Sequence, residues 1–197
     1  SAYFAGNIDE ISIFNTVLSP SDITTLYNSG TPTDLTDESG LIYWWRMGEN
    51  STFYSQILMP ENTNKDKFSN YSLDFDGVDD YVDIGSLSVD GEAKASWSCW
   101  IKSSDSNWQY LYGDDDIYFL YKQSISRVDF RFDNAIDYRT TGLITTLGTW
   151  NNVIVTFDGS LAQADRLKMY LNGGTPLTNT LSGTPATTVG GHATKTF

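Results

Sequence analysis

Apolar and polar residues alternate in short segments along much of the chain, and this pattern predicts β-strands. Within residues 3–17, Ile11 and Ile13 alternate with polar neighbours, as in a strand with one buried face. A turn signal at Gly6-Asn7 precedes them, so we expect either a strand pair or one bent strand over residues 3–17.

The same alternation recurs to the end of the chain, with turn-forming residues between the segments. Strands are expected near residues 41–47, 71–76, 80–84, 95–102, 108–112, 117–121, 126–132, 136–139, 150–157 and 167–172. No helical segments separate them as parallel crossovers would require, so the sheets should be antiparallel. The pattern predicts an all-β protein, an antiparallel jelly-roll β-sandwich.

One short helix is predicted over about residues 20–28. Ser19 is suited to the N-cap, and Pro20 to the first helical position. Asp22 stands three residues after the cap, which is capping-box spacing with Asp in place of Glu. Gly30 is expected to end the helix in a left-handed conformation.

Polar, turn-rich residues divide the chain into candidate units. Residues 31–40 have the composition of a linker, and residues 48–70 that of a long loop. We expect a strand and helix in residues 1–30 and a main β-sandwich in 41–197, which together form one compact domain over 1–197.

Composition excludes several classes of function. The 197 residues contain 12 Lys and Arg against 25 Asp and Glu, a net charge of −13. Nucleic acids and anionic membrane surfaces require a positive face, so neither is an expected partner. A single Cys excludes an intrachain disulfide, a single His excludes multi-His zinc sites, and no apolar run is long enough for a membrane span.

Five segments carry a family resemblance. Residues 150–159 (WNNVIVTFDG) and 167–173 (LKMYLNG) are two strands that each end in a turn. They resemble the "W-x-x-V-x-V-T-x-D … L-Y-x-N-G" signature of laminin G-type domains of the concanavalin A-like lectin/glucanase superfamily. The hairpin at 72–84, the strand at 96–102 and the strand at 4–15 resemble three further motifs of that family. The resemblance implies a jelly-roll sandwich and a lectin-like binding role.

The order of these segments differs from the family pattern, because the strand and helix that close such a domain come first here. Residues 1–30 could be the tail of a preceding domain in a tandem array. Alternatively, residues 1–17 fill the vacant strand position in this same domain, which makes it a circularly permuted sandwich. We favour closure by residues 1–17, since a sandwich lacking a core strand would expose an apolar edge. Strand exchange with a neighbouring copy remains an alternative.

The hairpin at 72–84 is rich in Asp. From spacing alone it is either a solvated acidic turn or a loose calcium site, because Ca²⁺ accepts carboxylate and carbonyl oxygens from separate segments. The resemblance implies one structural Ca²⁺ between this hairpin and the closing strand. Its implied ligands are Asp9, the Gly77 carbonyl, and Asp79 or Asp80.

Aromatic residues are the main indication of a ligand surface. The spacing predicts that Trp108, Tyr110 and Tyr112 share one face of a strand, followed by three carboxylates in a turn. Aromatic rings can stack on sugars or pack in a core, and the carboxylates can be ligand contacts or a solvated loop. The candidate ligand-binding residues are Trp108, Tyr110, Tyr112, Asp114, Asp115 and Asp116. Core packing is expected instead for Trp44, Trp97, Trp100 and Trp150.

A catalytic role is not expected. Retaining glycosidases need two carboxylates about 5 Å apart, and the chain has no same-face pair of Glu residues on one strand. Cys99 alternates with Trp97 and Ile101, which indicates packing and not a nucleophile. We expect a non-catalytic module that binds carbohydrate or a surface protein, at a cell surface, virion or other extracellular location. Assembly with neighbouring copies by strand complementation is the alternative, and a glycoside hydrolase is a more remote one.

Overall fold

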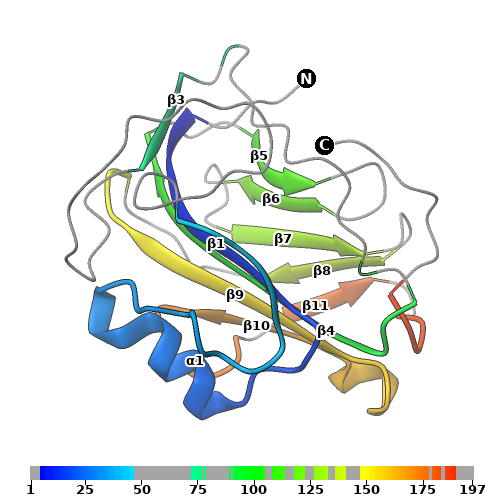
Figure 1. Cartoon of the computed structure of the whole chain (residues 1–197). Helices are drawn as coiled ribbons and strands as arrows, with labels where there is room; N and C mark the ends of the chain where they lie inside the picture. The colour runs from blue at the N-terminus through cyan, green and yellow to red at the C-terminus, as the bar shows by residue number, and fades with distance from the viewer. Residues whose placement is uncertain are drawn as a thin grey trace.

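The computed structural model consists of two β-sheets packed face to face, with one short helix outside them (Figure 1). It describes residues 5–46, 72–76, 78, 89, 91–104, 108–113, 118–122, 127–132, 136–140, 147–177, 179–182 and 185–189. Within these residues, no helix is long and apolar enough to cross a membrane. The strand expected near 80–84 and the loop expected over 48–70 lie outside them.

The first sheet, sheet A, has the strand order β10-β9-β4-β1-β2, and β3 also pairs with β1. Its strands are β1 (Ala5–Phe14), β2 (Leu41–Trp45), β3 (Leu73–Asp76), β4 (Lys94–Ser103), β9 (Asn151–Asp158) and β10 (Leu167–Leu171). Sheet B has the order β11-β8-β7-β6-β5. Its strands are β5 (Trp108–Gly113), β6 (Tyr118–Lys122), β7 (Arg127–Phe132), β8 (Ile136–Thr140) and β11 (Asn179–Ser182).

Every pairing between these strands is antiparallel. The predicted antiparallel β-sandwich is therefore confirmed. Strand β11 was not predicted, because its sequence NTLS lacks the apolar alternation that marked the others.

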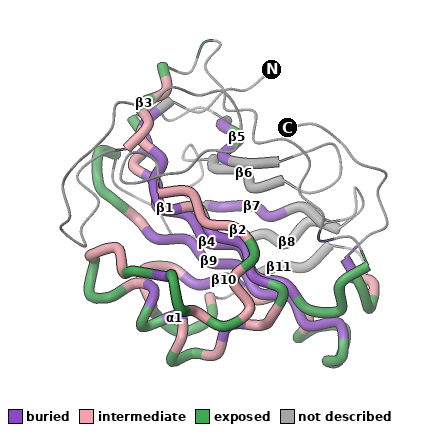
Figure 2. Tube along the Cα trace, in the orientation of Figure 1, coloured by how far each residue is buried: buried purple, intermediate pink, exposed green. Residues whose placement is uncertain are grey.

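The main core lies between the sheets. Trp97 of β4 and Phe130 of β7 meet there, with ring centroids 5.1 Å apart. Aliphatic side chains from β9 and β10 surround them, and most of β1, β4 and β9 is buried (Figure 2). Burial of this apolar surface is the dominant stabilising term of such a sandwich.

A second core lies on the other side of sheet A, beneath helix α1 (Pro20–Tyr27). Ile23 and Leu26 of the helix pack with Phe14 of β1 and Ile154 of β9. Strand β9 is thus buried on both faces, which explains the three consecutive apolar residues at its centre, Val153 to Val155. Leu35, in the segment expected to be a linker, is also buried in this cluster.

The helix begins as predicted. Ser19 Oγ accepts the Asp22 N–H, and the Asp22 carboxylate accepts the Ser19 N–H, so the capping box is complete. The helix ends at Tyr27, one residue before the expected end. Asn28 adopts the left-handed C-cap conformation, with φ of 42°, and a short 3₁₀ turn (Asn28–Gly30) follows. Asn tolerates this conformation through its short polar side chain.

Strand β1 is a single strand with one irregularity, as the second of the two predicted alternatives had it, and the expected turn at Gly6-Asn7 is wrong. Gly6 pairs with Phe75 on one side and Ser103 on the other. Its φ of 145° and the Lys102 carbonyl, 2.2 Å from where a Cβ would lie, explain why Gly is needed there. β1 lies between β4 and β2, inside sheet A.

Two of the four tryptophans expected to pack in a core are buried, namely Trp97 and Trp100. Trp44 is half-buried beside the helix cluster. The prediction for Trp150 was wrong, because 39% of this residue is exposed. It immediately precedes β9.

Candidate functional site

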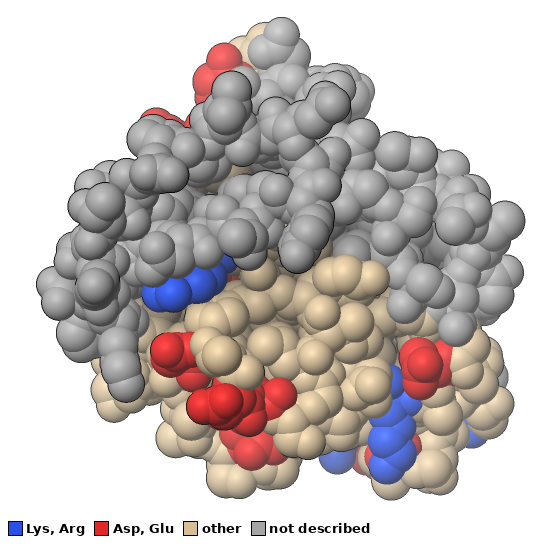
Figure 3. Space-filling model, viewed as in Figure 1, with Lys and Arg blue, Asp and Glu red and all other residues tan. Residues whose placement is uncertain are grey.

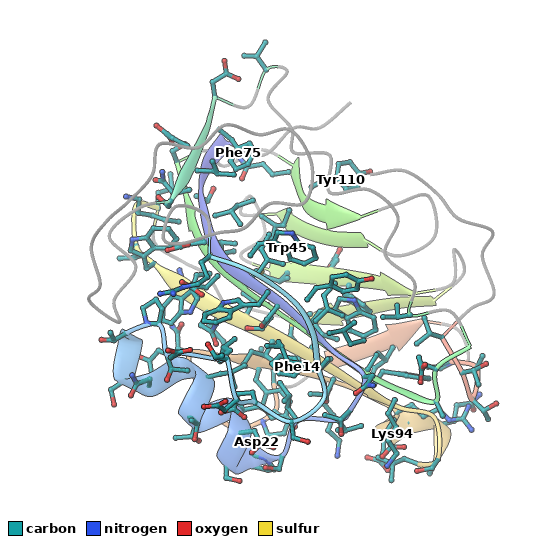
Figure 4. All side chains as sticks on the ribbon, in the orientation of Figure 1. Phe14, Asp22, Trp45, Phe75, Lys94 and Tyr110 are labelled. Carbon is teal, nitrogen blue, oxygen red and sulfur yellow. The ribbon has the colours of Figure 1, made fainter. Side chains whose placement is uncertain are left out.

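Of the three aromatic residues that were predicted to form a ligand surface, Tyr110 is the one whose side chain the structure describes. It lies on β5, the edge strand of sheet B, and 45% of it is exposed. Its neighbours Gln109 and Leu111 are buried, and Ser103 Oγ donates a hydrogen bond of 3.0 Å to Gln109 Oε1. Figure 4 shows Tyr110 apart from the inward-lying Phe14 and Trp45.

The strand register modifies the expected arrangement of the aromatic residues. Tyr110 is opposite Leu120, whereas Tyr112 is opposite Phe119, so the register shifts between them. This irregularity interrupts the simple alternation from which a shared face was predicted. The side chains of Trp108 and Tyr112, and all of Asp114, Asp115 and Asp116, lie outside the described part, so their ligand contacts stay predictions.

The register also places polar residues in line with Tyr110. Leu120 is opposite Asp129 of β7, and Asp129 is opposite Arg139 of β8. Asp129 alternates with Val128 and Phe130, which are both in the core between the sheets. Asp129 therefore lies on the outer side of sheet B, where only 6% of it is exposed. We call Tyr110, Asp129 and Arg139 the sheet B row.

Asp9, the implied calcium ligand on the closing strand, lies on β1 opposite Trp100. Its side chain is buried, and one carboxylate oxygen accepts the Glu10 N–H at 2.9 Å. Asp76, at the end of β3, is opposite Ala5. Gly77, Asp79 and Asp80 fall outside the described part, so the four-residue calcium site stays a prediction. In the part that is described, no three His, Cys, Asp or Glu side chains come together as metal ligands.

Glu10 is a buried carboxylate that the sequence analysis did not single out. Only 5% of it is exposed, and its φ is 48°. β1 holds one extra residue here, because Asp9 is opposite Trp100 while Ser12 is opposite Ser98. This is a β-bulge, and a non-glycine residue in the left-handed region is a strained position often found near function.

The Glu10 carboxylate accepts a hydrogen bond from Trp44 Nε1 and lies 3.8 Å from Arg46 Nε. With Ser12, Ser98 and Trp100 it lines a small pocket beneath the end of α1. The pocket has room for about one water-sized group, which is too little for a sugar ring. Glu10 therefore joins β1 to Trp44 and Arg46 on this side of the sheet. The larger exposed surfaces are the better candidates for ligand binding.

A signal for this bulge is present in the sequence. Ile8, Ile11 and Ile13 all contribute to the core between the sheets, but the first interval is three residues and the second is two. A strand that keeps one face buried across an interval of three must contain an extra residue. The insertion lies at Asp9-Glu10.

The two packed antiparallel sheets form a β-sandwich. A family model described as concanavalin A-like lectin/glucanases superfamily, of the laminin G type, matches residues 76–194, and the chain belongs to this superfamily. The predicted family membership is thus confirmed. No curated protein and no solved structure matches the chain. The matched stretch does not include β1, α1 or β2.

Proposed function

We propose that this domain is a non-catalytic, lectin-like module of a larger extracellular, cell-surface or virion protein, and that it binds carbohydrate or a surface protein. The observation that carries the proposal is the exposed side chain of Tyr110 on β5, the edge strand of sheet B. An aromatic ring supplies an apolar stacking face, and its hydroxyl supplies a polar contact. Membership of the superfamily supports a binding domain of this type.

The chemistry of Tyr110 suits a saccharide. Its hydroxyl can both donate and accept hydrogen bonds, so it offers a sugar both kinds of polar contact beside the ring. A few polar groups beside an apolar surface are the usual composition of small-ligand sites. Trp108, Tyr112 and Asp114 to Asp116 would extend this surface along β5 and the turn after it.

A glycan array tests this proposal, run with calcium and again with a chelator. Wild-type protein is expected to bind at least one glycan, and Tyr110→Ala is expected to weaken that binding about tenfold. Tyr110→Phe keeps the ring and should retain most of the affinity. Ile42→Ala removes a similarly exposed apolar side chain from sheet A and serves as the control.

Absence of glycan binding in both conditions would contradict the carbohydrate proposal and favour a protein partner. Release of reducing sugar that disappears on carboxylate substitution would contradict the non-catalytic assignment.

We also propose one structural Ca²⁺, held by Asp9, the Gly77 carbonyl, and Asp79 or Asp80. Carboxylate and carbonyl oxygens are the donors that Ca²⁺ prefers, and Asp9 is a buried carboxylate on the strand that the ion would tie to the hairpin. Added calcium should then raise the melting temperature by mass action, and Asp9→Asn should reduce this shift. Equal melting temperatures with calcium and chelator would contradict the site.

Assembly with neighbouring copies is the second candidate function. It is favoured by β1, which lies outside the matched stretch yet occupies an inner position in sheet A. In a repeated protein, such a strand can complete the neighbouring unit by strand addition. Analytical ultracentrifugation distinguishes the two functions, since concentration-dependent oligomers without glycan binding support assembly, and a glycan-binding monomer supports the lectin proposal.

A further inference from the structure

A second row of polar and aromatic side chains crosses the outer face of sheet A. Lys102 of β4 is opposite Asn7 of β1, and Asn7 is opposite Asp74 of β3. Lys102 Nζ stands 5.4 Å above the ring of Trp150, which immediately precedes β9. We call Trp150, Lys102, Asn7 and Asp74 the sheet A row.

The sheet A row lies on the more exposed side of its strands. Ile8, Ile101 and Ser103, the neighbours along β1 and β4, are buried, whereas Lys102 and Asn7 are half-buried and Asp74 is exposed. Trp100, two residues before Lys102, stacks on Tyr27 of α1 with centroids 6.0 Å apart. The sheet A row therefore lies on the face that carries α1, away from sheet B.

Contacts within the row hold its polar groups in position. Asn7 Nδ2 lies 3.3 Å from Asp74 Oδ1 and 3.4 Å from the Leu73 carbonyl. Lys102 forms no ion pair with a carboxylate in the described part of the chain. With 39% of Trp150 exposed, indole surface is in contact with solvent beside this ammonium group.

We propose that the sheet A row is a second saccharide-binding site, and that its ligand is a neutral saccharide chain. This inference rests on the proposed function, because it assigns carbohydrate to the same domain, but it places the ligand on the opposite sheet. Trp150 stacks on an apolar sugar face, Lys102 donates to hydroxyl or ring oxygens, and Asp74 accepts from hydroxyl groups.

The spacing and charge of the row determine the kind of ligand. Adjacent strands are about 4.8 Å apart, so the row from β9 to β3 extends over roughly 14 Å, which is longer than one sugar ring. Asp74 and the net charge of −13 disfavour an acidic chain. Figure 3 shows carboxylates gathered over the lower left of this face, where Figure 1 places α1. A neutral oligosaccharide satisfies the donors and the acceptor without adding negative charge.

Titration of the whole chain with neutral and uronate-containing oligosaccharides tests the inference. Trp150→Ala is expected to weaken binding of a neutral chain about tenfold, and Trp150→Phe to restore part of the affinity. Lys102→Ala should weaken binding several-fold. Leu161→Ala is the matched control, because Leu161 is 40% exposed in the turn just beyond the other end of β9. The melting temperature of each variant shows that it is folded.

The outcomes separate this inference from the proposed function. Binding that is lost in Trp150→Ala and kept in Tyr110→Ala supports the sheet A row. Affinity and stoichiometry that are unchanged in Trp150→Ala, with binding lost in Tyr110→Ala, overturn this inference and leave the proposed function intact. Binding of uronate chains alone, dependent on Lys102, overturns the assignment of a neutral ligand. Failure of the wild-type chain to bind any saccharide overturns both.

Discussion

The indole N–H of Trp44 donates a hydrogen bond to the buried carboxylate of Glu10, which joins strand β2 to the bulge in β1. The two residues are 34 positions apart in the sequence. Arg46 supplies a positive charge 3.8 Å from the same carboxylate. A buried carboxylate needs such partners, since its desolvation would otherwise cost several kcal/mol.

We expect Glu10→Gln to lower the free energy of unfolding by about 1–3 kcal/mol, because it removes the charge that Trp44 and Arg46 face. Trp44→Phe should cost about 1 kcal/mol through loss of the donor alone. Urea denaturation of both single variants and the double variant gives the coupling energy between them. Strictly additive effects would contradict a direct interaction.

The left-handed φ of Glu10 gives a second prediction. Glu10→Ala and Glu10→Gly both lose the carboxylate, but Gly adopts a φ of 48° without steric strain. The glycine variant should therefore be more stable than the alanine variant by about 1 kcal/mol. This reverses the usual order within a strand, where Gly is weaker than Ala. An alanine variant as stable as the glycine variant would show that the bulge relaxes.

Gly6→Ala should detach the start of β1 from β4. The new Cβ would lie 2.2 Å from the Lys102 carbonyl oxygen, so backbone must move. We expect a loss of about 2–4 kcal/mol from clash and strain together. Gly91→Ala is the matched control, because Gly91 also has positive φ but no atom within 4 Å. Hydrogen exchange of the β1 and β4 amides should accelerate in Gly6→Ala and stay slow in the control.

Burial raises the pKa of Cys99 from 9.0 to about 12. The folded thiol should resist alkylation at neutral pH and react only after unfolding in urea. Because the folded-state pKa is the higher one, the contribution of Cys99 to stability is complete below pH 9 and is lost as pH rises from 9 toward 12. Cys99→Ala should lose less stability than wild type over that interval. Equal losses would contradict the assignment.

Local signals predicted the elements well where the determining contacts are close in sequence. The capping box of Ser19 and Asp22 spans four residues, and it formed as expected. The prediction of a turn at Gly6 failed because the requirement for glycine comes from Lys102, which is distant in sequence. Asn28, and not Gly30, ends the helix, since the polar side chain satisfies the same local geometry.

The candidate sites were harder to predict than the strands. Tyr110 is exposed on its edge strand, but the register shift before Tyr112 interrupts the alternation that the prediction assumed. Trp150 was expected in the core and is instead partly exposed beside Lys102. Glu10 was passed over, because a lone Glu in a strand gives no sign of the partners that bury it.

Apolar periodicity, turn residues and family motifs in the sequence by themselves determined the β-sandwich, the short helix and the superfamily. These features act over a few residues, so they can be read along the chain. The tertiary structure alone decided that β1 lies between β4 and β2, that Glu10 is buried against Trp44, and that Lys102 stands over Trp150. Whether a side chain is exposed, and which residues it contacts, depends on the distant strands that pack beside it. The local sequence pattern does not show which strands these are.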